Sequence, residues 1–93
     1  IFGANRGSGG AIILDLNQDP TSPVEVADIN NWYCHDGMAK GDTLFLANGN
    51  NSIFSIWDVS VPSSPVLLAQ NQTVGYYSHN IWSSDDGNYI YTT

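Results

Sequence analysis

Three adjacent residues near the middle of the chain carry side chains that can do chemistry: Cys34, His35 and Asp36. A neutral imidazole is a good ligand for Zn²⁺ or Cu²⁺, and a carboxylate can join such a site or fix the tautomer of the imidazole. The pair His79-Asn80 matches His35-Asp36 and lies 44 residues further on. We therefore take His35 and His79 as candidate metal ligands, with Asp36 as a further ligand or as an orienting acceptor.

Cys34 is the only cysteine, so no intrachain disulfide can form. A neighbouring imidazolium lowers the pKa of a thiol, which makes Cys34 a candidate nucleophile beside His35. Neighbouring residues of a β-strand point to opposite faces, however, so the two side chains are expected to diverge. We expect a buried, unpaired cysteine, and we assign no catalytic residue.

Two further polar segments admit a binding interpretation. The stretch 85–88, Asp-Asp-Gly-Asn, is rich in oxygen ligands for Ca²⁺, but it lacks the spacing of a calcium loop, and we favour a hairpin turn. Asn50 and Asn71 each begin an Asn-x-Ser/Thr triplet and are candidate N-glycosylation sites. The cofactors that the sequence leaves open are thus Ca²⁺, Cu²⁺ and Zn²⁺.

The composition excludes some partners. The 93 residues are 42% apolar, which favours a folded chain, and they carry two basic and nine acidic side chains for a net charge of −7. Binding to a nucleic-acid backbone requires clustered Lys and Arg, so no nucleic acid is expected as a partner. No apolar run approaches the roughly 20 residues needed to span a bilayer.

An internal repeat organises the chain. Residues 1–16 align without a gap on residues 44–59, so that Asp15 recurs as Asp58, 43 residues later. The segment DPTSPVEVA then aligns on VPSSPVLLA, which pairs Pro20 and Pro23 with Pro62 and Pro65. A repeat length of 42 to 46 residues extends through the chain.

Each repeat has the pattern of short β-strands. Runs rich in β-branched and aromatic residues alternate with clusters of Gly, Asn, Asp, Ser and Pro, and no helical periodicity is present. In the complete repeat we predict strands at 33–39, 43–48, 53–59 and 65–71. Four short strands in 40 to 50 residues is typical of one blade of a β-propeller.

This pattern predicts an all-β chain of four-stranded antiparallel blades that forms part of one larger propeller domain. Residues 1–31 are expected to supply the last three strands of one blade, residues 32–72 a complete blade, and residues 73–93 the first two strands of the next. Since a propeller needs at least four blades, we expect the chain to be a fragment whose partners include other blades of a longer chain.

The segments ILDLNQDPTSPVEVA and IWDVSVPSSPVLLA resemble the LVIVD repeat, in which an apolar strand ending in Asp is followed by a Pro-x-x-Pro-Val turn. WYCHDGMAKGDTLFLA and HNIWSSDDGNYIYTT are similar to the corresponding segments of extracellular proteins of the choice-of-anchor B type. The resemblance spans almost the whole chain. It implies a secreted or surface-attached propeller, usually without assigned catalysis, and provides no catalytic residues.

Two functions follow from these observations. The first is a non-catalytic extracellular or cell-surface propeller that acts as a structural or interaction module with a protein or glycan partner. In that case His35 and His79, on the innermost strands, bond the adjacent blade and hold the blades together. The alternative is a metal-dependent oxidoreductase or hydrolase in which both histidines line the central channel and bind the metal.

Overall fold

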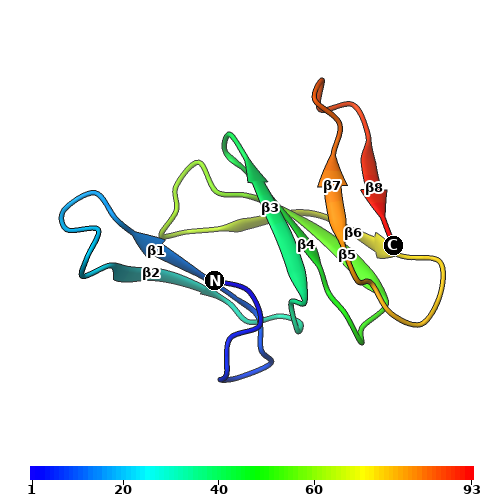
Figure 1. Cartoon of the computed structure of the whole chain (residues 1–93), viewed down its shortest axis with the longest axis horizontal. Coiled ribbons are helices and arrows are strands. Elements are labelled where there is room, and N and C mark those ends of the chain that lie inside the picture. Colours follow the sequence, from blue (N-terminus) through cyan, green and yellow to red (C-terminus); the bar gives the residue numbers. More distant parts are fainter.

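The computed structural model describes all 93 residues and contains eight strands in three antiparallel sheets. Figure 1 shows these sheets in sequence order, with the first hairpin and the last hairpin on either side of the central sheet. The strands are β1 (Ala11–Asp15), β2 (Val24–Ile29), β3 (Asp36–Lys40), β4 (Thr43–Ala47), β5 (Ile53–Asp58), β6 (Val66–Gln72), β7 (Ile81–Ser83) and β8 (Ile90–Thr92). The predicted all-β class is confirmed, and no helix of the kind that could cross a bilayer is present.

The central sheet has the order β3-β4-β5-β6, so the predicted four-stranded antiparallel sheet is confirmed. Three of its strands lie within one residue of the predicted limits, whereas β3 begins at Asp36 instead of residue 33. The β3–β4 turn contains Gly41 at φ 55° in open space, a conformation that glycine adopts without steric cost. Pro62 and Pro65 lie between β5 and β6, where no ladder hydrogen bond needs their missing N–H groups.

The repeat found in the sequence has a counterpart in backbone geometry. The β1–β2 pairing shifts register between Ile13 and Leu14, and the β5–β6 pairing shifts between the matching residues Ile56 and Trp57. The last residue of each of the strands β1 and β5 is an aspartate that caps the following turn. Asp15 Oδ1 accepts the backbone N–H of residue 17, and Asp58 Oδ1 accepts that of residue 60, each at 2.8 Å. The hairpins β1–β2 and β5–β6 are therefore structurally equivalent.

The first sheet contains two strands where the sequence predicts the last three strands of a blade. A remnant of the third is visible as one pair of backbone bonds, because Ile1 donates to Ile12 O at 2.9 Å and accepts from Ile12 N at 2.8 Å. The segment 3–10 then turns away from β1. Three of its glycines, at positions 3, 7 and 9, have positive φ. Glycine-rich backbone of this kind does not continue the strand.

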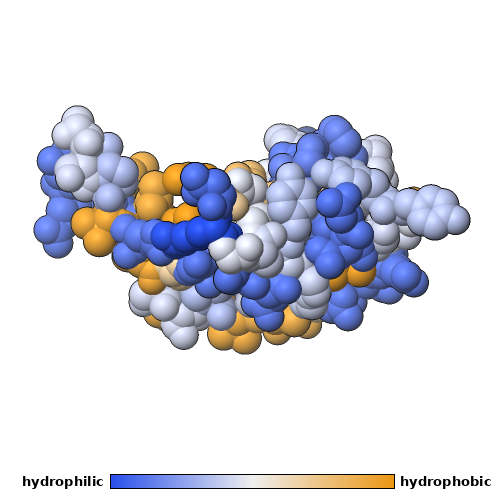
Figure 2. Space-filling model, turned by 90° about the horizontal axis from the view of Figure 1, so that it is seen from below, coloured by the Kyte–Doolittle hydropathy of each residue, from blue (hydrophilic) through white to orange (hydrophobic).

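The apolar core lies between the first hairpin and the central sheet. Its members are buried side chains from both sheets and from the segment that joins them: Ala11, Ile29, Cys34, Leu44, Leu46 and Trp57. By contrast, every residue of β6 is exposed, and this strand forms the edge of the central sheet. Figure 2 shows a face on which polar residues predominate and apolar residues are exposed in separate patches.

Candidate functional site

His35 and His79 occupy equivalent positions just before β3 and β7, and not within the strands as the sequence predicts. Each is nevertheless held by the hairpin that follows it. The backbone N–H of His35 donates to Ala47 O at 2.9 Å, and that of His79 donates to Thr93 O at 2.6 Å. Since Ala47 and Thr93 are matching residues of β4 and of the segment after β8, the repeat positions both imidazoles in the same way.

The two imidazole rings lie together although they are 44 residues apart in sequence. Their centroids are 4.4 Å apart, and the ring planes are tilted by 47°. The ring of Tyr77 lies 5.3 Å from that of His35 in an edge arrangement, and the ring of Tyr33 lies 6.4 Å from it. Two histidines and two tyrosines therefore form one cluster at the junction of the central sheet and the last hairpin.

Glycine at position 49 is required for this cluster. Gly49 has φ 45°, and a Cβ atom placed there would lie 2.7 Å from the ring of Tyr33 and 3.2 Å from the hydroxyl of Tyr77. The backbone of Gly49 also exchanges two hydrogen bonds of 3.0 Å with Ser78, which ties the end of β4 to the segment before β7. Any side chain at this position would displace the tyrosine rings.

Hydrogen bonds select the tautomer of each neutral imidazole. His35 Nδ1 lies 2.9 Å from the backbone carbonyl oxygen of His79, and His79 Nδ1 lies 2.9 Å from the side-chain oxygen of Asn80. Carbonyl oxygens only accept, so Nδ1 carries the hydrogen in each neutral ring, and Nε2 keeps its lone pair. The bond from His35 crosses between two sheets and joins the central sheet to the last hairpin.

Asp36 lies on β3, paired with Ala47, and its carboxylate forms no hydrogen bond or ion pair with either histidine. The structure contains no group of three or more His, Cys, Asp or Glu side chains arranged to hold a metal ion. Within this chain the cluster thus offers two imidazole nitrogens, His35 Nε2 and His79 Nε2, as protein ligands.

Cys34 is fully buried in the core, and its thiol contacts the backbone oxygen of Asp36 at 3.4 Å. Burial, with a smaller contribution from the nearby Asp36 carboxylate, raises the pKa of Cys34 to about 12. The matching residue of the next repeat, Ser78, is equally buried. A thiol that stays protonated and has no solvent access is not a nucleophile at neutral pH.

The segment 85–88 forms the β7–β8 turn. Asp86 Oδ1 accepts hydrogen bonds from the hydroxyl of Ser84 at 2.6 Å and from the backbone N–H of Asn88 at 3.0 Å, and Oδ2 accepts from the Asn88 amide at 3.0 Å. These hydrogen bonds lower the pKa of Asp86 to about 2. The bond from the Ser84 hydroxyl contributes most, and the bonds from Asn88 follow. Both carboxylate oxygens of Asp86 therefore accept hydrogen bonds within the turn.

Both candidate glycosylation sites are exposed. Asn50 lies in the turn between β4 and β5. Asn71 lies on the edge strand β6, and its side-chain oxygen accepts the backbone N–H of Gln72 at 2.8 Å.

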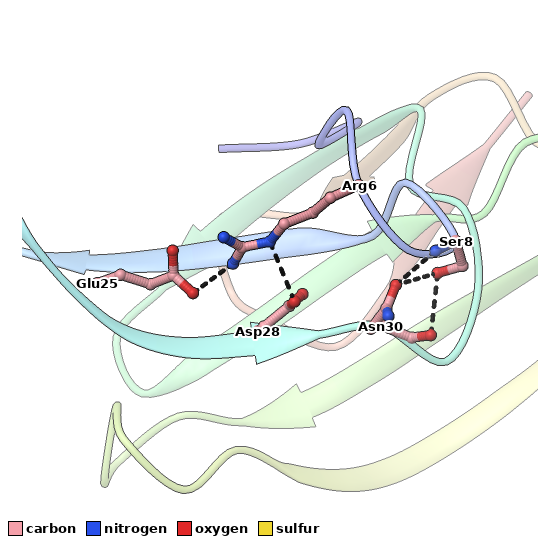
Figure 3. Close-up of polar contacts among 5 residues, drawn as sticks. All are labelled: Arg6, Ser8, Glu25, Asp28 and Asn30. Carbon is pink, nitrogen blue, oxygen red and sulfur yellow. Dashed lines mark hydrogen bonds and ion pairs between the residues drawn. The ribbon is translucent and has the colours of Figure 1, made fainter.

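Sequence reasoning missed two polar contacts that fasten residues 1–10 to the first hairpin (Figure 3). Arg6 forms ion pairs with Glu25 and Asp28 of β2, the latter at 3.4 Å. The hydroxyl of Ser8 donates to Asn30, whose side-chain oxygen also accepts the Ser8 backbone N–H at 2.6 Å. Neither pair follows from the repeat, because the equivalent residues of the next repeat are of other types.

Sequence reasoning also missed a bond between sheets. The ammonium group of Lys40, at the end of β3, donates to the backbone oxygens of Ser84 and Asp85 in the β7–β8 turn, each at 2.6 Å. The only signal for this contact is that residues 39–42 and 85–88 are matched turns of successive repeats.

A cavity of about 440 Å³ lies between the first hairpin and the turn before β6. It is lined by residues 13–17 at the end of β1 and just after it, by Val26 of β2, and by Pro62 and Ser63, and none of the histidine cluster lines it. It is therefore a separate hollow between neighbouring sheets.

No family model matches this chain, and no curated protein or solved structure is significantly similar to it.

Proposed function

We propose that the chain is a run of blades from a β-propeller that acts outside the cell as a non-catalytic structural and protein-interaction module. The main observation in support of a propeller fold is the repeated hairpin, which has the same register shift at Ile13/Leu14 and at Ile56/Trp57. Equivalent sheets that follow one another in sequence, as in Figure 1, are what stacked blades require. The likeness to the LVIVD repeat is consistent with this architecture.

Contacts between successive sheets support a structural role for His35 and Lys40. The imidazole of His35 donates to the backbone of His79, and Lys40 donates to two backbone oxygens of the next turn. All three acceptors are main-chain atoms, so these contacts do not depend on which side chains the next blade carries. A histidine in this role holds neighbouring blades in a fixed orientation.

The connection between β6 and β7 supports an interaction role. Val74 and Tyr76 lie on this connection and are almost fully exposed, at 103% and 98%. A tyrosine combines a large apolar ring with a polar hydroxyl, and tyrosines are enriched at sites where proteins bind one another. We assign residues 74–76 as the surface that a protein or glycan partner contacts.

A binding screen tests this function. The chain is presented to arrays of extracellular proteins and of glycans, beside the double variant Val74→Ser/Tyr76→Ser and the control Val61→Ser, whose side chain is also exposed. We expect at least one partner whose binding falls about tenfold or more in the double variant and is unchanged in the control. Binding that is equal in all three proteins would show that residues 74–76 are not the contact surface.

The two candidate glycosylation sites have their own test. Expression through a eukaryotic secretory pathway is expected to add N-glycans at Asn50 and Asn71, since both side chains are exposed. Intact mass before and after enzymatic removal of N-glycans measures their number, and the variants Asn50→Gln and Asn71→Gln assign them. Secreted chain without any glycan at either site would remove this support for an extracellular protein.

The second candidate, a metal-dependent oxidoreductase or hydrolase, is favoured by one observation, the 4.4 Å separation of the two imidazole rings. It requires an activity that depends on bound metal and disappears in both His35→Ala and His79→Ala while the fold is retained. Finding such an activity would overturn the non-catalytic function.

A further inference from the structure

The two nitrogens of each clustered imidazole are in different states. Nδ1 of both rings donates to an oxygen, whereas Nε2 of both rings bonds no protein atom. We infer that His35 and His79 form a two-imidazole site for a divalent transition metal, with Cu²⁺ as the preferred ion, through their Nε2 atoms. This inference goes beyond the proposed function, because a non-catalytic module can carry such a site.

The hydrogen bonds prepare both rings for a metal. In protein metal sites the ligating histidine commonly donates its other N–H to a carbonyl or carboxylate, which fixes the tautomer and the ring orientation. Here the backbone oxygen of His79 accepts the Nδ1–H of His35, and the side-chain oxygen of Asn80 accepts the Nδ1–H of His79. The acceptor that orients the His35 ring is therefore the main chain of the other ligand residue, which ties His35 to the backbone at His79.

The ring separation favours one coordination geometry. Suppose that both Nε2 atoms bind one ion at about 2.1 Å. An N–metal–N angle near 90° then places the ring centroids about 4.5 Å apart, whereas a tetrahedral angle places them about 5.2 Å apart. The observed separation is 4.4 Å. A right angle between neighbouring ligands suits tetragonal Cu²⁺ better than tetrahedral Zn²⁺, and nitrogen ligands bind Cu²⁺ most tightly among the first-row divalent ions.

The surroundings leave the site open to solvent on one side. His79 is exposed and His35 is half-buried, with the tyrosine rings of residues 33 and 77 beside them. Water completes the coordination sphere of the ion, since the buried thiol of Cys34 faces the core. Two imidazoles with water give a modest affinity that competing chelators can measure.

Titration with Cu²⁺ against a weak chelator such as glycine tests the site. We expect one Cu²⁺ per chain and a paramagnetic resonance spectrum with hyperfine coupling to two nitrogens. Zn²⁺ is expected to bind at least about tenfold more weakly, following the order of ligand affinities for divalent metals. A spectrum that shows one nitrogen or none would overturn the two-imidazole site.

Variants separate this site from binding elsewhere on the chain. His35→Ala and His79→Ala each remove a ligand and should abolish the two-nitrogen spectrum, whereas Asp42→Asn, which keeps both ligands, should leave it unchanged. Asn80→Asp keeps an acceptor for His79 and should retain affinity, while Asn80→Leu removes it and should lose about tenfold. Cu²⁺ binding that survives in the double histidine variant would assign the ion to another group, such as the terminal amine, and overturn the inference.

A metal-free measurement tests the tautomers. Nitrogen NMR shifts of the neutral imidazoles should show protonated Nδ1 and unprotonated Nε2 in both residues, because the two acceptors hold the proton at Nδ1. Protonated Nε2 in either ring would contradict the arrangement on which the site depends.

Discussion

Trp57 donates its indole N–H to the hydroxyl of Ser55, two residues earlier on β5, at 3.0 Å. Ser55 in turn donates to the side-chain oxygen of Asn48 at 2.8 Å, and the Asn48 amide donates to Tyr33 O at 3.0 Å. Ser55, Asn48 and Trp57 are all buried. A polar chain with every member satisfied thus links β5 to the backbone of Tyr33 in the histidine cluster.

Replacing Ser55 with alanine breaks this chain in the middle. The Trp57 N–H and the Asn48 oxygen then stay buried without a partner, so we expect a loss of about 1–3 kcal/mol in the free energy of unfolding. Denaturant titration measures it, with the exposed Ser63→Ala as the control. A change below about 0.5 kcal/mol in Ser55→Ala would mean that water or another group replaces the hydroxyl.

Leu46 is one of the most buried large apolar side chains, at 1% exposure, and lies on β4 within the core. Leu46→Ala leaves a cavity that its neighbours cannot fill, and we expect a loss of about 2–5 kcal/mol. Leu68 on the edge strand β6 is 59% exposed, so Leu68→Ala should change stability by less than about 0.5 kcal/mol. Equal effects of the two changes would show that the core is not where the structure places it.

The Cys34 thiol should resist alkylation. Its pKa is raised from 9.0 to about 12 by burial, so the thiolate fraction at pH 8 is about 1,000-fold lower than in the unfolded chain. Iodoacetamide should therefore react at least that much more slowly with the native chain than with the chain in guanidinium chloride. A thiol at an exposed position, introduced as Ser60→Cys with Cys34→Ser, provides the fast control.

The same shift gives a pH dependence with a defined sign. A folded pKa above the ordinary value means that burial of the neutral Cys34 thiol contributes stability fully below pH 9.0, and that this contribution is lost as the pH rises through about 12. Cys34→Ser removes the dependence. An unchanged loss of stability above pH 9 in that variant would assign the effect to other groups.

Asp86 should titrate at about pH 2, below its ordinary 3.8. Because the folded pKa is lowered, the carboxylate contributes stability above pH 3.8 and loses it as the pH falls towards 2. Carbon NMR of the Asp86 carboxyl group measures the midpoint. Ser84→Ala removes the main cause and should raise the midpoint more than Asn88→Ala, which keeps the backbone N–H; the reverse order would contradict the assigned contacts.

Much of the local structure follows from the amino-acid pattern. The runs at 43–48 and 53–59 are dense in apolar and β-branched residues and end in turn-forming residues, and both became strands within one residue of their predicted limits. The start of β3 was misplaced because Tyr33 and Cys34 look like strand residues, yet they belong to the segment that crosses between sheets. Strand propensity cannot separate the two cases, since both bury apolar side chains.

The sequence by itself determined the β-class, the repeat with its matched Asp15 and Asp58, and the equivalence of His35 and His79, because each depends on residue types at a fixed spacing. Only the tertiary structure decided that the two imidazoles lie 4.4 Å apart, that Asp36 does not contact them, and that Lys40 and Arg6 bind where they do. Such contacts depend on how neighbouring sheets pack and on which rotamers that packing allows. No spacing in one strand contains this information.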